Sequence, residues 1–295
     1  MRPGLLLLTA LLVLFTCVCA EAVERNSKLH KECISNLHAA LNKGTDWERV
    51  HAAEALIRVG EAKSVIARFE LQAYKAGPKY RIGVWRVLAQ AYRNDLGKHS
   101  KYLKRIISAF NNTNGPDRLH AVETLGKLGY SAQTKYIIQA ANNTSSTLRV
   151  NSIWVLANTG RAKYIQMLAD CLESPDATVR SEAAYALRFL PKVNAAALES
   201  LKSAAERENI STGADVYIVS ALCVQATRHG KGKDAKTEIK TYATGNNDEK
   251  YELCACLASI GNKSDIPLLK RLLKDKSLDV RTSAANAILS ITSRK

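Results

Sequence analysis

The stretch that decides the fold is Pro175-Asp176-Ala177-Thr178-Val179-Arg180-Ser181-Glu182-Ala183-Ala184-Tyr185-Ala186-Leu187-Arg188-Phe189-Leu190. Counted from Arg180, small or apolar residues fall at positions +3, +4, +6, +7 and +10. These positions share one face of a helix with about 3.6 residues per turn. Because several of them are alanines, a second helix can approach this face closely. The stretch therefore predicts a helix that packs side by side with similar helices.

The same template recurs along most of the chain, at spacings of 31–37 residues. The anchor residues that match Arg180 are Arg49, Arg81, Arg118, Arg149, Tyr217, Lys250 and Arg281. Position +7 is a branched aliphatic residue in every copy: Leu56, Leu88, Leu125, Leu156, Leu187, Val224, Leu257 and Ile288. Self-similarity at such a period indicates a protein built from stacked repeats.

Each repeat is predicted to contain two helices joined by a turn. Glycine stands at position +11 in four copies, where it can end a helix in the left-handed conformation: Gly60, Gly129, Gly160 and Gly261. A second apolar-periodic segment follows each stop, for example 65–71, 102–107 and 266–273. Asp46, Asp176 and Asp279 stand where N-cap or first-turn acids are expected.

The pattern Asp-x-x-Val-Arg-x-x-Ala-Ala-x-Ala-Leu is clearest at 176–187 and is echoed at 46–56 and 279–288. It resembles HEAT repeats, most closely the short variety also found in phycobilisome-lyase-type repeat proteins. The resemblance covers roughly residues 46–295. It implies an all-α fold, a right-handed α-solenoid of about eight HEAT-like helical pairs, which usually serves as a protein-binding scaffold.

The two ends of the chain carry separate expectations. Residues 1–20 combine Arg2, a run of apolar residues and a small-residue site ending at Ala20, as in a cleaved signal peptide. An uncleaved membrane anchor is the alternative. Residues 21–45 are predicted to form an N-terminal capping helix, and residues 46–295 the repeat domain. We therefore expect a secreted or periplasmic protein with no transmembrane segment after cleavage.

The last repeat contains a first helix but too few residues for a second one. Ile288 and Ile291 lie on the apolar side of that helix. Terminal repeats normally need a polar cap. The sequence therefore predicts self-association through the C-terminal end, or an apolar contact with a partner there.

The chain is strongly basic, with 43 Lys and Arg against 27 Asp and Glu and a net charge of +16. Signal cleavage would remove only Arg2 and leave +15. Such an excess favours anionic partners. Many of the cations fall on second helices, which we expect to line the concave side: Lys101, Lys104, Arg105, Lys236, Lys240, Lys270, Arg271 and Lys274. They predict a groove for an acidic protein segment or an anionic polysaccharide, with a merely solvated lysine face as the alternative. Export argues against nucleic acid.

Trp154 and Tyr185 occupy position +5 of adjacent repeats, a position that is mostly polar elsewhere. That stripe is predicted to face water, where two aromatic rings could stack on a sugar or anchor a partner. Packing beneath a neighbouring loop is the competing interpretation. The arginines at the anchor position are predicted to pair with an Asp of a neighbouring repeat or with carbonyl groups, as an internal ladder.

Signs of catalysis are absent from the sequence. It contains no Ser nucleophile elbow, no His-Glu-x-x-His metal motif and no phosphate-cradling glycine loop. We expect no catalytic residue, metal or cofactor. A disulfide between Cys223 and Cys254 or Cys256 stays open, and so does glycosylation of the Asn-x-Ser/Thr sequons at Asn111, Asn142, Asn143, Asn209 and Asn262.

The leading functional hypothesis is an exported, non-enzymatic scaffold that binds a protein partner through the solenoid surface. The alternative is a binder of an anionic glycan or envelope polymer through the basic groove. A lyase-type enzyme is a third, less favoured reading.

Overall fold

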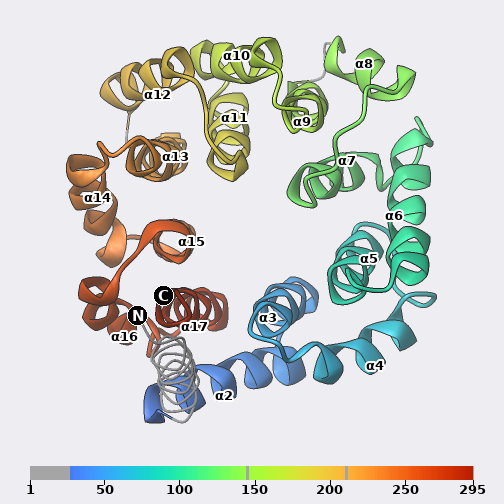
Figure 1. The fold of residues 1–295 in the computed structure, drawn as a ribbon, viewed down its shortest axis with the longest axis vertical. Coiled ribbons are helices and arrows are strands. Elements are labelled where there is room, and N and C mark those ends of the chain that lie inside the picture. The colour runs from blue at the N-terminus through green and yellow to red at the C-terminus, as the bar shows by residue number, and fades with distance from the viewer. Residues whose placement is uncertain (1–26, 144–145, 210–211, 295) are drawn as a thin grey trace, which may run out of the picture.

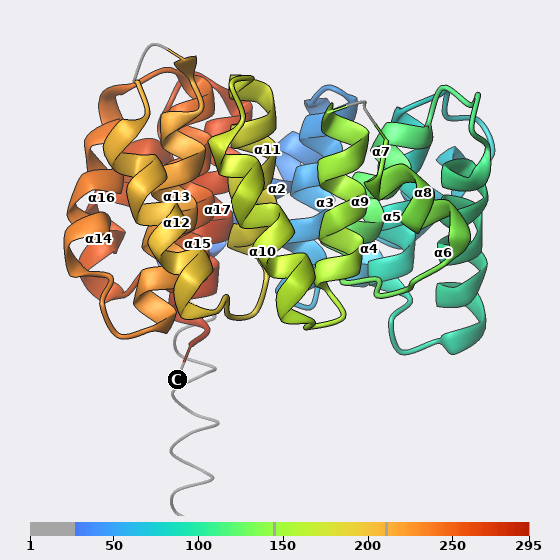
Figure 2. The same cartoon turned by 90° about the horizontal axis from the view of Figure 1, so that it is seen from above.

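The structure is a computed structural model that describes residues 27–143, 146–209 and 212–294. These residues form sixteen α-helices and no strand, so the predicted all-α fold is confirmed. The helices form two concentric layers that bend round into a ring (Figure 1). Seen from the side, the helices stand next to one another in a band (Figure 2).

The first helices of the eight repeats line the inside of the ring (Figure 1). They are α3 (Asp46–Arg58), α5 (Tyr80–Ala91), α7 (Arg118–Lys127), α9 (Ser146–Ala157), α11 (Ala177–Phe189), α13 (Asp215–Arg228), α15 (Asn247–Ile260) and α17 (Leu278–Thr292).

The outside of the ring is formed by the second helices (Figure 1). They are α4 (Ala62–Gln72), α6 (Leu96–Asn111), α8 (Lys135–Ala141), α10 (Ala162–Asp170), α12 (Ala195–Arg207), α14 (Lys233–Ile239) and α16 (Ile266–Leu272), joined by the N-terminal helix α2 (Lys28–Lys43). Short 3₁₀ segments follow or precede some of them: η1 (Cys171–Glu173), η3 (Lys240–Thr244) and η4 (Lys263–Asp265).

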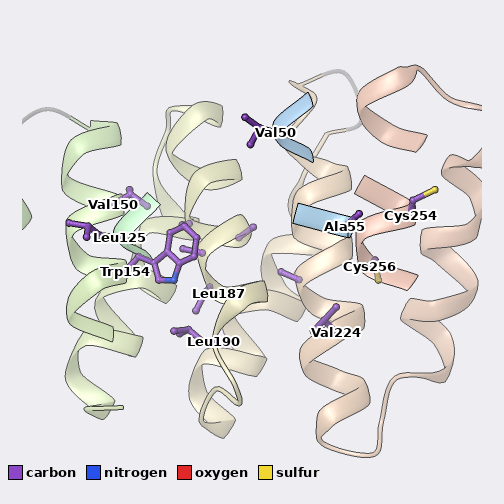
Figure 3. Packing of buried hydrophobic residues seen from close by; sticks show 14 of the residues in the cluster. Val50, Ala55, Leu125, Val150, Trp154, Leu187, Leu190, Val224, Cys254 and Cys256 are labelled. Atoms are coloured by element: carbon purple, nitrogen blue, oxygen red, sulfur yellow. The ribbon is translucent and has the colours of Figure 1, made fainter. Parts of the chain in front are cut away.

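The core runs between the two layers, and position +7 supplies its most regular part. All eight residues of that series are at most 2% exposed. Figure 3 shows Leu125 of α7, Leu187 of α11 and Val224 of α13 among the buried side chains. The eight predicted repeats are therefore confirmed, including the irregular copy anchored at Tyr217.

Local capping signals define where several helices begin and end. Asp176 accepts a hydrogen bond from the Thr178 amide at the start of α11. Gly60, Gly129 and Gly160 take positive φ after their helices, as predicted. Gly261 does not, since its φ is −63°. Glycine is needed there for space, because a Cβ would lie 2.7 Å from the Ile291 side chain of α17.

The two ends of the repeat array meet, and this the sequence analysis did not predict. Helix α17 packs against α2 and α3, so that the last repeat contacts the first (Figure 1). Across this seam, His51 Nδ1 lies 2.9 Å from Asp279 Oδ1, and Arg58 donates a hydrogen bond to Asn286. The array is therefore a closed ring rather than an open solenoid.

Helix α2 supplies the second helix that the last repeat lacks. It lies on the outside of α17, in the place that α4 takes beside α3 (Figure 1). Ile288 and Ile291 are 1% and 3% exposed, and Ile291 lies next to Gly261 at the end of α15. The prediction of an uncovered apolar end is therefore wrong. Because self-association at the C-terminal end was inferred from that exposed surface, the structure gives no reason to expect it.

Candidate functional site

Positions +2 and +5 of the first helices face the middle of the ring, not bulk water. Arg86, at +5, is 3% exposed, and Trp154, at +5 of another repeat, is 0% exposed. The prediction of a water-facing stripe is therefore wrong for these residues. Ring closure explains the difference, because it turns the polar face of every first helix towards the other first helices.

Trp154 is buried because α7 leaves room for its ring. A Cβ on Gly126 would lie 2.5 Å from the Trp154 indole. On its other side the indole packs on Tyr185 and Phe189 of α11, with centroids 6.0 and 5.2 Å away. Figure 3 shows the indole within the buried cluster. Trp154 therefore offers no stacking surface to a sugar, and the alternative of packing inside the fold describes it better.

Replacing Gly126 by alanine should destabilise the protein. The added methyl group has no space unless the indole of Trp154 moves, and overpacking of this kind costs about 1–3 kcal/mol. Urea unfolding followed by circular dichroism measures the change. Gly129→Ala is not a suitable control, because Gly129 has φ +68°. Gly97→Ala on α6, where a Cβ meets nothing closer than 3.5 Å, should not lower the midpoint, since alanine favours a helix over glycine. Equal midpoints for Gly126→Ala and the parent would contradict this account.

Charged side chains that face the middle of the ring are largely paired with one another. Glu54 of α3 accepts hydrogen bonds from Arg86 Nε at 2.6 Å and from Gln90 Nε2 at 2.9 Å. Burial disfavours the charged form of Glu54, but the Arg86 guanidinium holds the pKa of this carboxyl below its usual range. This pair therefore ties α3 to α5.

A second pair joins α11 to α15, which are separated in the ring by α13. Arg188 of α11 lies 3.0 Å from Glu252 of α15, and the two side chains are 6% and 1% exposed. Burial alone would lower the pKa of the Arg188 guanidinium, but the Glu252 carboxylate holds it above its usual value. The guanidinium also lies 5.0 Å from the centroid of the Tyr185 ring.

Helix α7 contributes the third group. Lys127 lies 2.7 Å from Glu123 on the same helix, and its Nζ is 5.2 Å from the Tyr185 centroid on α11. Glu123 also lies 3.8 Å from His120. Two of these contacts, Lys127 to Tyr185 and Arg188 to Glu252, skip a repeat, because the first helices face one another across the inside of the ring. The middle of the ring is therefore crossed by side chains that hold it together.

The second helices do not form the concave groove that was predicted, because they lie on the outside of the ring. The cations of α6 and those of α14, η3 and α16 are on opposite sides (Figure 1). Lys236 and Lys240 are each 2.7 Å from buried Asp265, which neutralises part of their charge. The candidate residues Lys101, Lys104 and Arg105 are thus brought together, while Lys270, Arg271 and Lys274 belong to a separate surface.

Aromatic rings surround the cations of α6. Arg105 lies 4.6 Å from the centroid of Tyr74, 5.7 Å from Trp85 and 5.8 Å from Tyr102. Lys101 lies 5.4 Å from Tyr102 and 5.8 Å from Tyr74. Such contacts fix long side chains that would otherwise sample many rotamers. Lys101 and Arg105 also lower the pKa of the Tyr74 hydroxyl.

This surface also exposes apolar groups that the sequence analysis missed. Leu71 is 72% exposed and Tyr74 is 70% exposed at the end of α4. Leu71 was predicted to belong to the apolar side of its helix, but only Val65 and Phe69, four residues apart, are buried on α4. Leu71 falls off that face by helical spacing, which is the signal that could have identified it. We call Leu71, Tyr74, Lys101, Lys104 and Arg105 the α4–α6 surface.

The arginine ladder predicted at the anchor position is present at Arg81, Arg118, Arg180 and Arg281. Arg81 binds Asp117 at the start of the next repeat, and Arg180 binds Glu208 and the carbonyl groups of residues 174 and 175. Arg281 donates to the carbonyl groups of residues 275 and 276. Arg149 differs, since it is exposed beside a cleft that Cys171 and Glu173 also line.

The cysteines of the described residues are all buried free thiols: Cys33, Cys171, Cys223, Cys254 and Cys256. Burial raises the pKa of the Cys33 thiol to about 12. Such thiols are poor nucleophiles. Figure 3 shows Cys254 and Cys256 in the core.

Three further predictions concern membranes, metals and glycans. The signal peptide at 1–20 lies outside the described residues. Within them, no helix is long and apolar enough to cross a membrane, and no group of three or more His, Cys, Asp or Glu side chains could hold a metal ion. Asn142, Asn143, Asn209 and Asn262 are exposed. Asn111 is half-buried, and glycosylation of all five stays a prediction.

Comparisons with known proteins identify the repeats. A family model described as HEAT repeats matches residues 103–188 and 134–212, and a second, described as HEAT repeat, matches residues 266–294. No curated protein matches the chain significantly.

Two crystal structures of engineered proteins from the Northeast Structural Genomics Consortium are similar over much of the chain. The first is 16% identical, covers 87% of this chain and 78% of its own, and has a TM-score of 0.32. The second is 17% identical, with coverages of 88% and 96% and a TM-score of 0.21. Scores this low add no weight to the assignment. Both family models describe HEAT repeats, and the helical pairs that they match continue around the ring, so these findings support placing the chain among HEAT-repeat proteins.

Proposed function

We propose that this protein is an exported, non-enzymatic scaffold that binds an acidic segment of a partner protein on the α4–α6 surface. HEAT repeats commonly mediate contacts between proteins, and such solenoids are typically scaffolds rather than enzymes. Export is proposed from the signal-peptide pattern of residues 1–20.

The observation that carries the proposal is the unneutralised charge of α6. Lys101, Lys104 and Arg105 lie within 4.0 Å of no carboxylate in the part of the chain that the structure describes. Lys101 and Arg105 are also held against aromatic rings. Preorganised cations lose little conformational entropy when they bind carboxylates, so they favour an acidic ligand.

The exposed apolar groups beside these cations favour a polypeptide over a polysaccharide. Tyr74 is 70% exposed and lies against Lys101 and Arg105, so the surface offers an aromatic group next to its cations, as protein interfaces do. The burial of Trp154 removes the main observation in favour of sugar stacking. Binding of an anionic glycan remains the alternative outcome of the test.

Charge reversal of the α4–α6 surface should weaken binding to acidic peptides. The probes are fluorescent peptides that combine Glu or Asp with aromatic residues, compared with peptides in which Gln and Asn replace the acids. Lys101→Glu, Lys104→Glu and Arg105→Glu together should reduce affinity at least tenfold, and raised salt should weaken wild-type binding.

The matched control reverses three cations at and just after the end of α16, with Lys270→Glu, Arg271→Glu and Lys274→Glu, and so makes the same change in net charge. Equal affinity for both triple variants would contradict the proposal. Binding of heparin-like oligosaccharides but of no acidic peptide would assign the surface to glycans instead.

A further inference from the structure

One edge of the ring is formed by the turns that join each first helix to its second helix. Neighbouring turns contact one another along this edge. Arg161 donates a hydrogen bond to Gln133 at 3.2 Å, and Arg294 donates one to the Gly261 carbonyl group at 2.9 Å. The C-terminal end of α17 lies at the same edge, which is the lower one in Figure 2. We call these turns, with the first turns of the outer helices, the turn edge.

Exposed lysines mark the turn edge in every repeat. In two repeats the lysine stands in the turn itself, at Lys192 before α12 and at Lys263 before α16. The other six outer helices hold one within their first turn: Lys28, Lys63, Lys98, Lys135, Lys163 and Lys233. Lysines therefore follow the whole circumference of the ring on one side.

The stability of the helices does not explain these lysines. The N-terminal end of a helix carries a partial positive charge, so it favours acids and disfavours cations. In the described residues, the first turns of α2, α4, α6, α8 and α10 contain no acid, yet each holds an exposed lysine. Because these lysines oppose the helix dipole, a partner that supplies negative charge is the better explanation for them.

The charge of the turn edge is not neutralised within the protein. The six first-turn lysines lie within 4.0 Å of no carboxylate in the part of the chain that the structure describes. Further exposed cations of this edge outnumber its exposed acids. The cations are Lys31, Arg93, Arg161, Lys231 and Arg294, and the acids are Glu61, Asp95 and Asp234.

The opposite edge, formed by the loops between repeats, differs in this respect. Lys250 Nζ lies 3.0 Å from Asp275 there. Asp46, Asp176 and Asp248 are exposed at that edge. Acids thus accompany the cations at the opposite edge, whereas cations predominate at the turn edge.

We propose that the turn edge docks on the surface of a membrane that bears anionic phospholipids. Lysines spaced around one side of a ring can all reach a planar surface at the same time, whereas a single extended polymer would reach few of them. Each lysine near an anionic membrane adds to the attraction. The ammonium groups stay among the lipid headgroups, so no charge has to enter the hydrocarbon.

The place where α2 begins supports a membrane as the partner. Helix α2 packs against α17 and begins at the turn edge, with Lys28 as its first residue. The apolar run of residues 5–18 precedes Lys28 by ten residues in the sequence. A membrane that receives this run, during export or as an anchor, is therefore within reach of the turn edge.

Flotation with large unilamellar vesicles tests the proposal. The protein is the chain that begins at Glu21, which lacks the apolar run, so that run cannot carry the binding. We expect it to float with vesicles of phosphatidylglycerol mixed with phosphatidylcholine and not with phosphatidylcholine alone. Raised salt should weaken the binding, because it screens exposed charges.

Charge reversal at the turn edge should remove the binding. Lys63→Glu, Lys135→Glu, Lys163→Glu and Lys233→Glu together should reduce affinity for the anionic vesicles at least tenfold. None of these lysines is on α6, so the α4–α6 surface is unchanged and the two proposals fail separately. Because acids in a first turn favour a helix, circular dichroism should show a melting temperature no lower than that of the wild type.

The matched control reverses four exposed lysines of the opposite edge, Lys43→Glu, Lys75→Glu, Lys274→Glu and Lys276→Glu, and makes the same change in net charge. It should keep most of the binding. Equal losses in the two variants, equal binding to neutral and anionic vesicles, or binding to heparin without binding to vesicles would each overturn the proposal.

Discussion

Deletion of residues 1–44, which removes helix α2, should cost most of the stability of the protein. Cys33, Leu37, Ala40 and Leu41 of α2 are at most 3% exposed and pack into the core that α17 shares. Burial of a large apolar side chain contributes about 1.5–3 kcal/mol. Total stabilities are typically about 5–15 kcal/mol, so the shortened chain should unfold early or aggregate.

The control is deletion of residues 1–26, which leaves α2 in place. Thermal unfolding and size-exclusion chromatography should show a folded monomer for this control and a large loss of folded protein without α2. Similar melting temperatures for the two shortened chains would show that α2 does not complete the last repeat.

Substitution of Glu252 by leucine should cost about 3–5 kcal/mol, because it leaves the buried Arg188 cation without its partner. The double variant Arg188→Met, Glu252→Leu should recover most of that loss, since no charge is then left buried. Urea unfolding of both single variants and the double variant gives the coupling energy. Additive losses would contradict a direct Arg188–Glu252 interaction.

The repeats could be predicted because they depend on local periodicity. The +7 series and the glycine stops require only that neighbouring helices pack, and the structure buries that series throughout. Ring closure could not be predicted in the same way. It depends on small rotations between repeats that accumulate around the array, and no single spacing in the sequence reports them.

The site was predicted incorrectly in part because the sequence does not report that the ring closes. In an open solenoid position +5 faces water, but closure places Arg86 in the middle of the ring. Trp154 is buried because Gly126 leaves space one repeat away. Glycine within the helix at Gly126 was the available signal, since glycine is unfavourable in a helix interior unless another group needs the room. The α4–α6 surface was found only in part, through its cations.

Ring closure is tested most directly by the distance between α3 and α17. Spin labels are attached at Arg58→Cys and Asn286→Cys in a chain that begins at Glu21, and the distance between them is measured by pulsed electron–electron double resonance. The native cysteines of this chain are buried. A closed ring predicts one short distance, because Arg58 and Asn286 contact each other on neighbouring helices whose axes should lie roughly 8–10 Å apart. An open array would separate these helices by seven such spacings, so a distribution centred near roughly 60 Å would contradict the ring.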